Sequence, residues 1–241
     1  VTAFFQKWYV PNNATLTICG DFDPAEAKEL VEQYFGEIPR GADVQSVTSA
    51  EAALTEEVVV RKTDDVPHDK LWIAWITPAL YADGDAEMDI ISSLLAEGKD
   101  SRLYKTLVLD KKIAREVEAY QYSARLHGQY IIEATPTEGH TTEELLAEID
   151  AILAEFKETG PGEEEIEIAV LNWEAHFFDG LQTISSKANM LNSYNIITGD
   201  PGFISQDLER YRSVSRDSVM SAVNTWLPAD RRVVLLSLIH I

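Results

Sequence analysis

The sequence has a single cysteine, few basic residues and no long apolar run, and each shortage excludes a class of protein. With Cys19 alone, no disulfide can form within the chain. Lys and Arg number 20 against 41 Asp and Glu, a formal net charge of -21, so phosphate backbones and anionic membrane surfaces repel the chain on average. No stretch approaches the roughly 18 consecutive apolar residues of a transmembrane helix. Neither nucleic acid nor a membrane is therefore an expected partner.

What the chain does have is enough apolar sequence for one large core, or for one domain and a fragment of another. It is 241 residues long and 45% hydrophobic. Cys19 lies in the β-branched run 15–19, where a small buried core residue is favoured over a reactive thiol. One free cysteine fits an envelope location as well as the cytosol, so the composition leaves the compartment open.

The first 40 residues predict a helix, a strand and a second helix. Aromatic residues recur at helical spacing over residues 4–9, and the run 15–19 predicts a strand. Asp23 before Pro24 is a favourable N-cap, and Gly36 would end the helix that follows. From residue 38 to 56 the sequence has Pro39, Gly41 and many Ser, Thr and Ala residues without clear periodicity, which is the composition of a linker. We therefore predict that residues 1–40 are the tail of one domain, 41–56 a linker and 57–241 a second domain.

Strands and helices are grouped in the second part rather than strictly alternating. Strands are predicted at 57–62, 70–77, 114–122, 129–136 and 232–238, and helices at 86–95, 101–109, 142–159, 163–178, 184–197, 203–211 and 216–227. The strand 70–77 is apolar on both alternating sets, which predicts a central strand covered on both faces. This grouping is typical of an α+β fold with a mostly antiparallel sheet and helices packed on one face.

A short similarity between two distant segments supports the division into domains. Residues 8–18 and 226–235 both place an aromatic residue at the end of a helix, a proline in the turn and a strand afterwards. The two prolines, Pro11 and Pro228, are too far apart for a solenoid repeat and suit tandem domains. A chance match remains the alternative.

No set of side chains for catalysis or metal binding stands out, and we predict no catalytic residue and no metal site. No two histidines have the close spacing that zinc sites use. A nucleophile elbow, a phosphate-binding loop and a dinucleotide motif are also missing from the sequence. The five histidines are His68, His127, His140, His176 and His240.

The most distinctive polar stretch is 98–107, where a glycine loop opens a helix. Backbone N–H groups at such a start can receive a carboxylate or a peptide carbonyl. We therefore name Gly98, Ser101, Arg102 and Tyr104 as candidate substrate-binding residues. The alternative is structural: a capped helix in which Arg102 pairs with an acid.

Several motifs together resemble the pitrilysin/insulinase-type metallopeptidases, which carry an inverted zinc motif. Tyr9-Val-Pro-Asn-Asn-Ala-Thr-Leu16, Gly20-Asp-Phe-Asp-Pro24 and Tyr34-Phe-Gly-Glu-Ile-Pro-Arg-Gly41 resemble the end of that family's first domain. Ser101-Arg-Leu-Tyr-Lys-Thr-Leu107 followed by Lys112-Ile-Ala114 looks like the domain after it. The resemblance implies the family's LuxS/MPP-like α+β module, used in tandem around peptide substrates.

The same resemblance implies what this chain lacks. The motif His-x-x-Glu-His lies upstream of the matching segment in family members and is not in this sequence, so both Lewis acid and general base are missing. Relatives also hold substrate with an Arg and Tyr pair, whose positions here are Val108 and Arg115. We expect this chain alone to be inactive and to bind no cofactor, with zinc in the intact parent protein.

Two functions are compatible with these implications. In the first, the chain is a non-catalytic domain that packs against a zinc-bearing domain, of the same protein or of a partner subunit, and helps enclose peptides. In the second, it is an inactive scaffold subunit of the same family. Similar bacterial proteins suggest the periplasm. Zinc motif residues elsewhere in the parent protein would separate the two readings.

Overall fold

The computed structural model describes residues 1–45, 47 and 53–239 and divides into two compact units. Unit 1 comprises Val1–Thr48 and Ala175–Gln206, and unit 2 comprises Ser49–Glu174 and Asp207–Ile241. Within the predicted linker 41–56, residues 46 and 48–52 lie outside the described residues, as does His240. The proposed domain boundaries stay a prediction.

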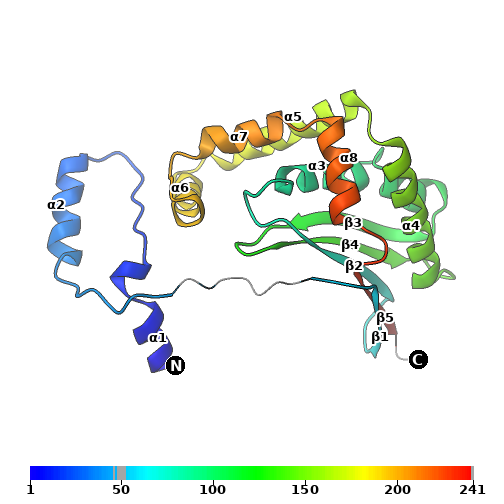
Figure 1. Cartoon of the computed structure of the whole chain (residues 1–241), viewed down its shortest axis with the longest axis horizontal. Coiled ribbons are helices and arrows are strands. Elements are labelled where there is room, and N and C mark those ends of the chain that lie inside the picture. The colour runs from blue at the N-terminus through cyan, green and yellow to red at the C-terminus, as the bar shows by residue number, and fades with distance from the viewer. Residues whose placement is uncertain (46, 48–52, 240–241) are drawn as a thin grey trace. The chain divides into compact units, whose positions relative to one another are not determined.

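Unit 2 is built on a five-stranded sheet with the order β1-β5-β2-β4-β3 (Figure 1). All neighbouring strands pair antiparallel except β1 and β5, which are parallel. The predicted α+β class with a mostly antiparallel sheet is confirmed, and so is the central place of the strand at 70–77. The strands are β1 Val58–Asp64, β2 Lys70–Thr77, β3 Ala114–Tyr122, β4 Gly128–Pro136 and β5 Val233–Ile239.

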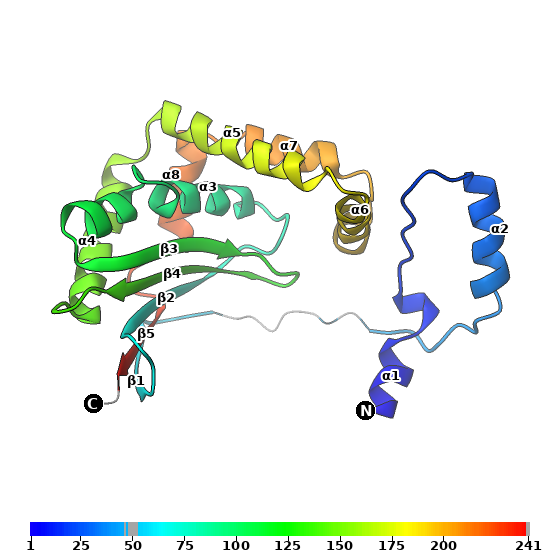
Figure 2. The same ribbon diagram turned by 180° about the vertical axis from the view of Figure 1, so that it is seen from behind.

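The helices of unit 2 lie on one face of this sheet (Figures 1 and 2). On β2, Leu71, Ile73 and Trp75 face them and are buried, whereas the alternate residues are half-buried. Our expectation that both faces of this strand are covered is therefore wrong for the described part of unit 2. Apolar residues on both sides of a strand indicate that both avoid water, but they do not identify what shields each side.

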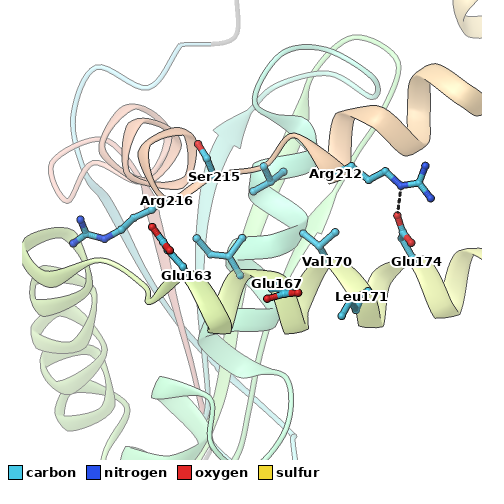
Figure 3. A pocket seen from close by; sticks show the side chains of 10 residues that line it. Glu163, Glu167, Val170, Leu171, Glu174, Arg212, Ser215 and Arg216 are labelled. Atoms are coloured by element: carbon cyan, nitrogen blue, oxygen red, sulfur yellow. Dashed lines mark hydrogen bonds and ion pairs between the residues drawn. The ribbon is translucent and has the colours of Figure 1, made fainter.

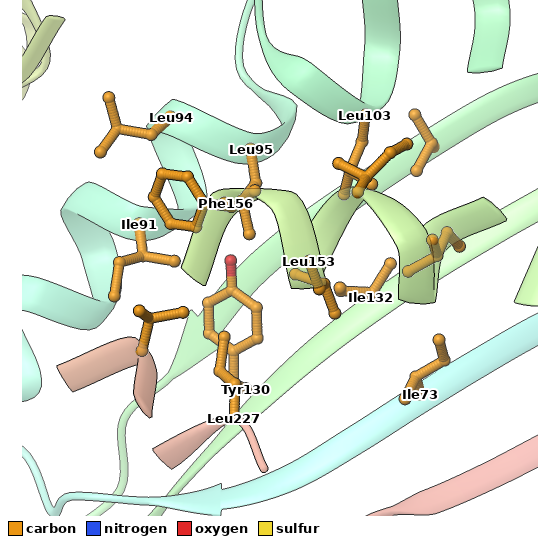
Figure 4. Packing of buried hydrophobic residues seen from close by; sticks show 14 of the residues in the cluster. Ile73, Ile91, Leu94, Leu95, Leu103, Tyr130, Ile132, Leu153, Phe156 and Leu227 are labelled. Carbon is orange, nitrogen blue, oxygen red and sulfur yellow. The ribbon is translucent and has the colours of Figure 1, made fainter. Parts of the chain in front are cut away.

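Three helices form the layer against the sheet: α3 Asp85–Ala96, α4 Thr142–Thr159 and α8 Arg216–Trp226. Their apolar stripes meet the sheet in one contiguous core, where Leu95, Tyr130 and Phe156 are fully enclosed (Figure 4). Burying each side chain of this size contributes about 1.5–3 kcal/mol. Two further helices extend over α3, namely α5 Glu163–Gly180 and α7 Ile204–Arg212.

The ends of the helices follow their capping residues. Ser215 and Ser218 form a reciprocal capping box that starts α8, and Val214 and Val219 beside it are buried. Thr141 accepts a hydrogen bond from the Glu144 N–H at 3.1 Å at the start of α4. Both starts agree with the helices predicted from the sequence at 142–159 and 216–227.

The predicted helix at 101–109 takes an unexpected form. After one short helical turn, residues Tyr104–Asp110 form a π-helix, in which Leu107 is buried. Its widened turn shows in the hydrogen bond from Lys111 N–H to Thr106 O at 2.9 Å. Such turns are rare, and no residue type marks them, which is why the sequence did not distinguish this one from an α-helix.

Unit 1 has the predicted helices but not the predicted strand. It contains α1 Thr2–Trp8, α2 Pro24–Phe35 and α6 Ile184–Thr198. Asp23 caps α2 as expected, accepting from the N–H groups of Ala25 and Glu26 at 2.7 and 3.2 Å. The strand at 15–19 is wrong: no neighbouring strand lies in the described part of unit 1 to complete a ladder, and Cys19 is half-buried rather than buried.

Candidate functional site

The loop before the π-helix brings the four predicted substrate-binding residues together, but it turns two of them inward. Gly98 has a φ of +82°, and no atom lies within 4 Å of where its side chain would stand, so the left-handed backbone rather than crowding favours glycine. Ser101 is 6% exposed and donates to Gly98 O at 2.8 Å. Tyr104 is half-buried against the core.

Arg102 is already engaged within unit 2. It donates to Leu94 O at 3.3 Å and to Glu165 at 3.0 Å, and its guanidinium lies 4.7 Å from the ring of Phe156. Burial opposes ionisation of Glu165, but hydrogen bonds from Gly162 and Arg102 outweigh it and lower the pKa of this carboxyl. Arg102 therefore ties α3 to α4 and α5, as the structural alternative requires. Peptide binding at the four residues stays a prediction.

The more extensive candidate surface is the sheet face that the helices of unit 2 leave uncovered. Cross-strand pairs place its members side by side: Trp72 is opposite Leu235, Ala74 opposite Ile131, and Ile131 opposite Tyr120. None of its apolar residues is fully buried, and Tyr122 is 63% exposed. We define the open sheet face by Val60, Trp72, Ala74, Ile76, Tyr120, Tyr122, Ile131, Val233 and Leu235.

A polar network crosses the open sheet face. Glu133 accepts from Tyr120 Oη at 2.5 Å and pairs with Lys70 Nζ at 2.8 Å, and Lys70 lies 5.2 Å from the ring of Trp72. Burial favours the neutral acid, but the bonds from Lys70 and Tyr120 outweigh it and lower the pKa of Glu133. The bond to Glu133 likewise raises the pKa of Lys70, and raises that of Tyr120 to about 12. The charges of Lys70 and Glu133 are thus paired with each other, whereas Glu118, opposite Glu133 on β3, is exposed.

This arrangement suits binding and not catalysis. Aromatic and aliphatic side chains around a satisfied ion pair can receive apolar groups of an extended segment. Glu133 is held by two donors, so it is a poor general base. Over the described ranges, no group of three or more His, Cys, Asp and Glu residues is arranged to hold a metal. The residues present therefore do not fit a zinc ion, and no zinc-dependent step can be assigned to them.

Our reading of the sequence missed this face as a site. The signal was present in the doubly apolar run 71–76, which we assigned to a strand buried on both sides. Pairing of Tyr120 with Glu133 depends on strand register, which a single sequence does not specify.

A groove of about 510 Å³ lies on the helical side, between α5 and the connection from α7 to α8 (Figure 3). Val170 and Leu171 contribute apolar surface. Arg212 pairs with Glu174 at 2.5 Å at one end, and Arg216 donates to backbone oxygens near the end of α4. With both arginines engaged and glutamates beside them, the groove has no pronounced charge preference.

A second hollow, of about 550 Å³, includes the position matched to the family's substrate-holding tyrosine. Arg115 occupies it and lies 2.8 Å from His68 Nε2. His140, on the rim, is 2.8 Å from Glu144. A guanidinium here cannot reproduce a phenol that both donates and accepts, so the family's pairing is not formed by this residue.

The sequence comparisons match this chain to a domain of a peptidase family and to a zinc protease. The profile described as "Peptidase M16 inactive domain" matches residues 1–172. Zinc protease PqqE of Helicobacter pylori (strain ATCC 700392 / 26695) is 24% identical over 199 residues, which are 80% of this chain and 44% of that protein. The chain thus spans less than half the length of this relative.

Solved structures share the fold. A protease from Helicobacter pylori matches with a TM-score of 0.85 and 20% identity, over 98% of this chain and 57% of that one. A peptidase M16 inactive domain structure from Pseudomonas fluorescens matches with a TM-score of 0.83 and 16% identity, over 100% of this chain and 57% of its own. In the described part of this chain, no helix has the length and apolar content to cross a membrane.

Proposed function

Because the chain belongs to the peptidase M16 inactive-domain family, we propose that it is the non-catalytic part of a zinc metallopeptidase, packs against a zinc-bearing domain and helps enclose peptide substrates. The observation that carries the proposal is the open sheet face, an apolar and aromatic surface in which Lys70 and Glu133 form an ion pair. A surface of this kind is rarely left in water unless it meets a partner or a ligand.

The lengths of the relatives support a zinc-bearing partner. This chain covers 44% of the zinc protease PqqE and 57% of the Helicobacter pylori protease structure. The remaining length of such proteins is sufficient for a second domain of similar size. Zinc would then be supplied by that domain or by a partner subunit, since no donor set occurs in the described residues here.

The substrate class follows from the same face. The Lys70–Glu133 pair and the aromatic rings suit an extended peptide with apolar side chains better than a strongly charged one. A neighbour of the same fold, the ferredoxin protease FusC, was solved in complex with Arabidopsis ferredoxin, which is consistent with a protein-derived substrate. Another neighbour is the periplasmic protease PqqL from Escherichia coli, and we propose the periplasm on this basis.

The decisive experiment measures zinc content and hydrolysis of fluorogenic peptides for this chain and for the full-length product of its gene. We expect neither in this chain and both in the full-length product. Stoichiometric zinc or turnover by this chain would overturn the proposal. Absence of zinc from the full-length product and from its partners would favour the inactive scaffold instead.

A matched pair of variants tests the role of the open sheet face. In the full-length protein, Ile131→Asp places a charge at the centre of this face, and we expect kcat/KM to fall about tenfold or more, because a buried unpaired charge weakens binding by more than 1 kcal/mol. Leu126→Asp, in the exposed β3–β4 turn, is the control and should leave kcat/KM unchanged. Equal activity of both variants, at unchanged zinc content, would contradict the proposed contact.

A further inference from the structure

Three aspartates surround one arginine between α3 and α7, away from the open sheet face. Arg210 donates to Asp85 at 2.9 Å and to Asp207 at 2.7 Å. Asp89, one turn along α3 from Asp85, accepts from Tyr211 Oη at 2.5 Å. Asp85, Asp207 and Tyr211 are buried, whereas Asp89 is half-buried and the side chain of Arg210 is 18% exposed.

Residues from other elements of the fold also contact the cluster. The Tyr81 N–H and Ser123 Oγ donate to Asp85 at 2.9 and 2.5 Å, and Tyr81 has a φ of +65°, an uncommon backbone conformation for a tyrosine. From α5, the ring of Trp173 stacks on that of Tyr211. On β4, burial and the nearby charge of Asp89 both raise the pKa of Tyr130.

The charges of this cluster do not balance when all its carboxylates are ionised. The ionisable groups that face Asp89 are Asp85 on its own helix, Asp207, Arg210 and Tyr211 on α7, and Tyr130 on β4. Three negative charges then meet one positive charge. Asp85 and Asp207 bind the guanidinium directly, whereas the hydrogen bond to Asp89 comes from a neutral phenol. Asp89 is thus the member whose ionisation is least compensated.

We propose that this cluster is a proton-operated latch, in which Asp89 holds α7 firmly on α3 when it carries a proton and loosens that hold when it is ionised. α7 is the helix through which the chain crosses from unit 1 to unit 2, between Gln206 and Asp207. All members of the cluster lie in unit 2, so the latch controls how firmly residues 207–212 of α7 are held on α3. It does not depend on the proposed peptidase role.

The direction of the pH dependence follows from the proton's preference for the folded state. Burial, partly opposed by the bond from Tyr211, raises the pKa of Asp89 from 3.8 to about 7. Because the folded protein binds this proton more tightly than the unfolded chain, the stabilisation is complete below about pH 4 and is lost as pH rises through about 7. We expect a tighter α7 at pH 6 than at pH 8.

Amide hydrogen exchange of peptides covering α7 tests the latch on the whole chain. After correction for the intrinsic pH dependence of amide exchange, protection of Ile204–Arg212 should fall by up to about tenfold between pH 6 and pH 8, because a carboxyl with a pKa of about 7 changes from mostly protonated to mostly ionised over that range. Asp89→Asn, a neutral group of the same shape, should keep α7 protected at both pH values. Asp83→Asn removes an exposed carboxylate nearby and should behave as the unaltered chain.

Two results would overturn the latch. The first is an Asp89→Asn variant that loses protection with pH as the unaltered chain does, because another group, such as a histidine, would then be responsible. The second result comes from the unaltered chain, so that it does not depend on a variant that folds. With ¹³C labels at the aspartate carboxyls, NMR should show Asp89 titrating between about pH 6 and 8, and a midpoint near pH 4 contradicts the proposal. Tyr211→Phe should move that midpoint upward, since its hydrogen bond favours the charged form.

Discussion

Amphipathic helices in the two units carry similar sequence patterns but bury very different amounts of surface. In unit 2, α4 buries Leu145, Ile149 and Phe156 among others. In unit 1, α2 has an equally regular stripe, yet it buries none of its residues, and Leu30 and Tyr34 are 44% and 69% exposed. Among the described residues of unit 1, Tyr194 is the one buried large hydrophobic residue.

This contrast teaches that a hydrophobic stripe identifies the face of a helix that avoids water without identifying what covers it. Cores are close-packed and cooperative, so a side chain within unit 2 should influence the unfolding of the whole unit. A side chain of similar type in unit 1 should influence its own helix. The following substitutions test this difference.

The largest difference should come from removing leucine side chains. Leu95→Ala in α3, where the leucine is fully buried, should lower the free energy of unfolding by about 2–5 kcal/mol. Leu30→Ala in α2 should change it by less than about 0.5 kcal/mol. Urea denaturation followed by circular dichroism measures both, and equal losses would mean that α2 belongs to a cooperative core.

A smaller difference should come from adding a methyl group at glycines. At Gly128 a Cβ atom would lie 2.5 Å from both Pro78 O and Gln121 Nε2, so Gly128→Ala should destabilise unit 2 by about 1–3 kcal/mol. Gly180, at the end of α5, has no atom within 4 Å of that position, and Gly180→Ala should stabilise by up to about 0.5–1 kcal/mol. Thermal unfolding should show opposite shifts in Tm, and a shift of the same sign would refute the contrast.

Removing the helix caps should separate a global from a local effect. Ser215→Ala at the start of α8 and Asp23→Ala at the start of α2 each remove a cap worth about 1 kcal/mol. The first should shift the urea midpoint of unit 2, whereas the second should increase amide exchange within α2 and leave that midpoint unchanged. A midpoint shift with Asp23→Ala would show that the two units unfold together.

The smallest effect is expected on the open sheet face, whose apolar residues, like most of those in unit 1, are not fully buried. Because the side chain of Lys70 is 33% exposed, Lys70→Gln should cost less than about 1 kcal/mol. The lowered pKa of Glu133 gives stability that is present above about pH 4.5 and is lost as the pH falls through the folded-state pKa. The free energy of unfolding of the variant should therefore fall less at acid pH than that of the unaltered chain. An unchanged acid dependence would mean that groups other than Glu133 cause it.

Much of unit 2 could be predicted from local sequence because its signals are local. Ser215 and Thr141 mark helix starts through hydrogen bonds to backbone three residues away, and the period of two in β2 follows from its own side chains. The absence of a zinc motif could likewise be read directly, since such motifs need fixed spacing.

The parts that could not be predicted depend on distant segments. Tyr120 meets Glu133 through the β3–β4 register, and Arg210 meets Asp85 across 125 residues. The strand expected at 15–19 failed for the same reason, because a strand exists only beside another strand. Local patterns therefore indicated the helices and the central strand, whereas the open sheet face and the aspartate cluster required the structure.

The parallel pairing of β1 with β5 has a consequence for how the protein is made. Among the described strands, β1 has β5 as its neighbour, and the contact between Glu57 and Arg232 joins residues 175 apart. During synthesis β1 leaves the ribosome before the other described strands and stays without this partner until β5 inserts between it and β2. Such a long-range step slows folding and leaves apolar valines of β1 open to wrong pairing, so chaperone protection should matter most before β5 emerges.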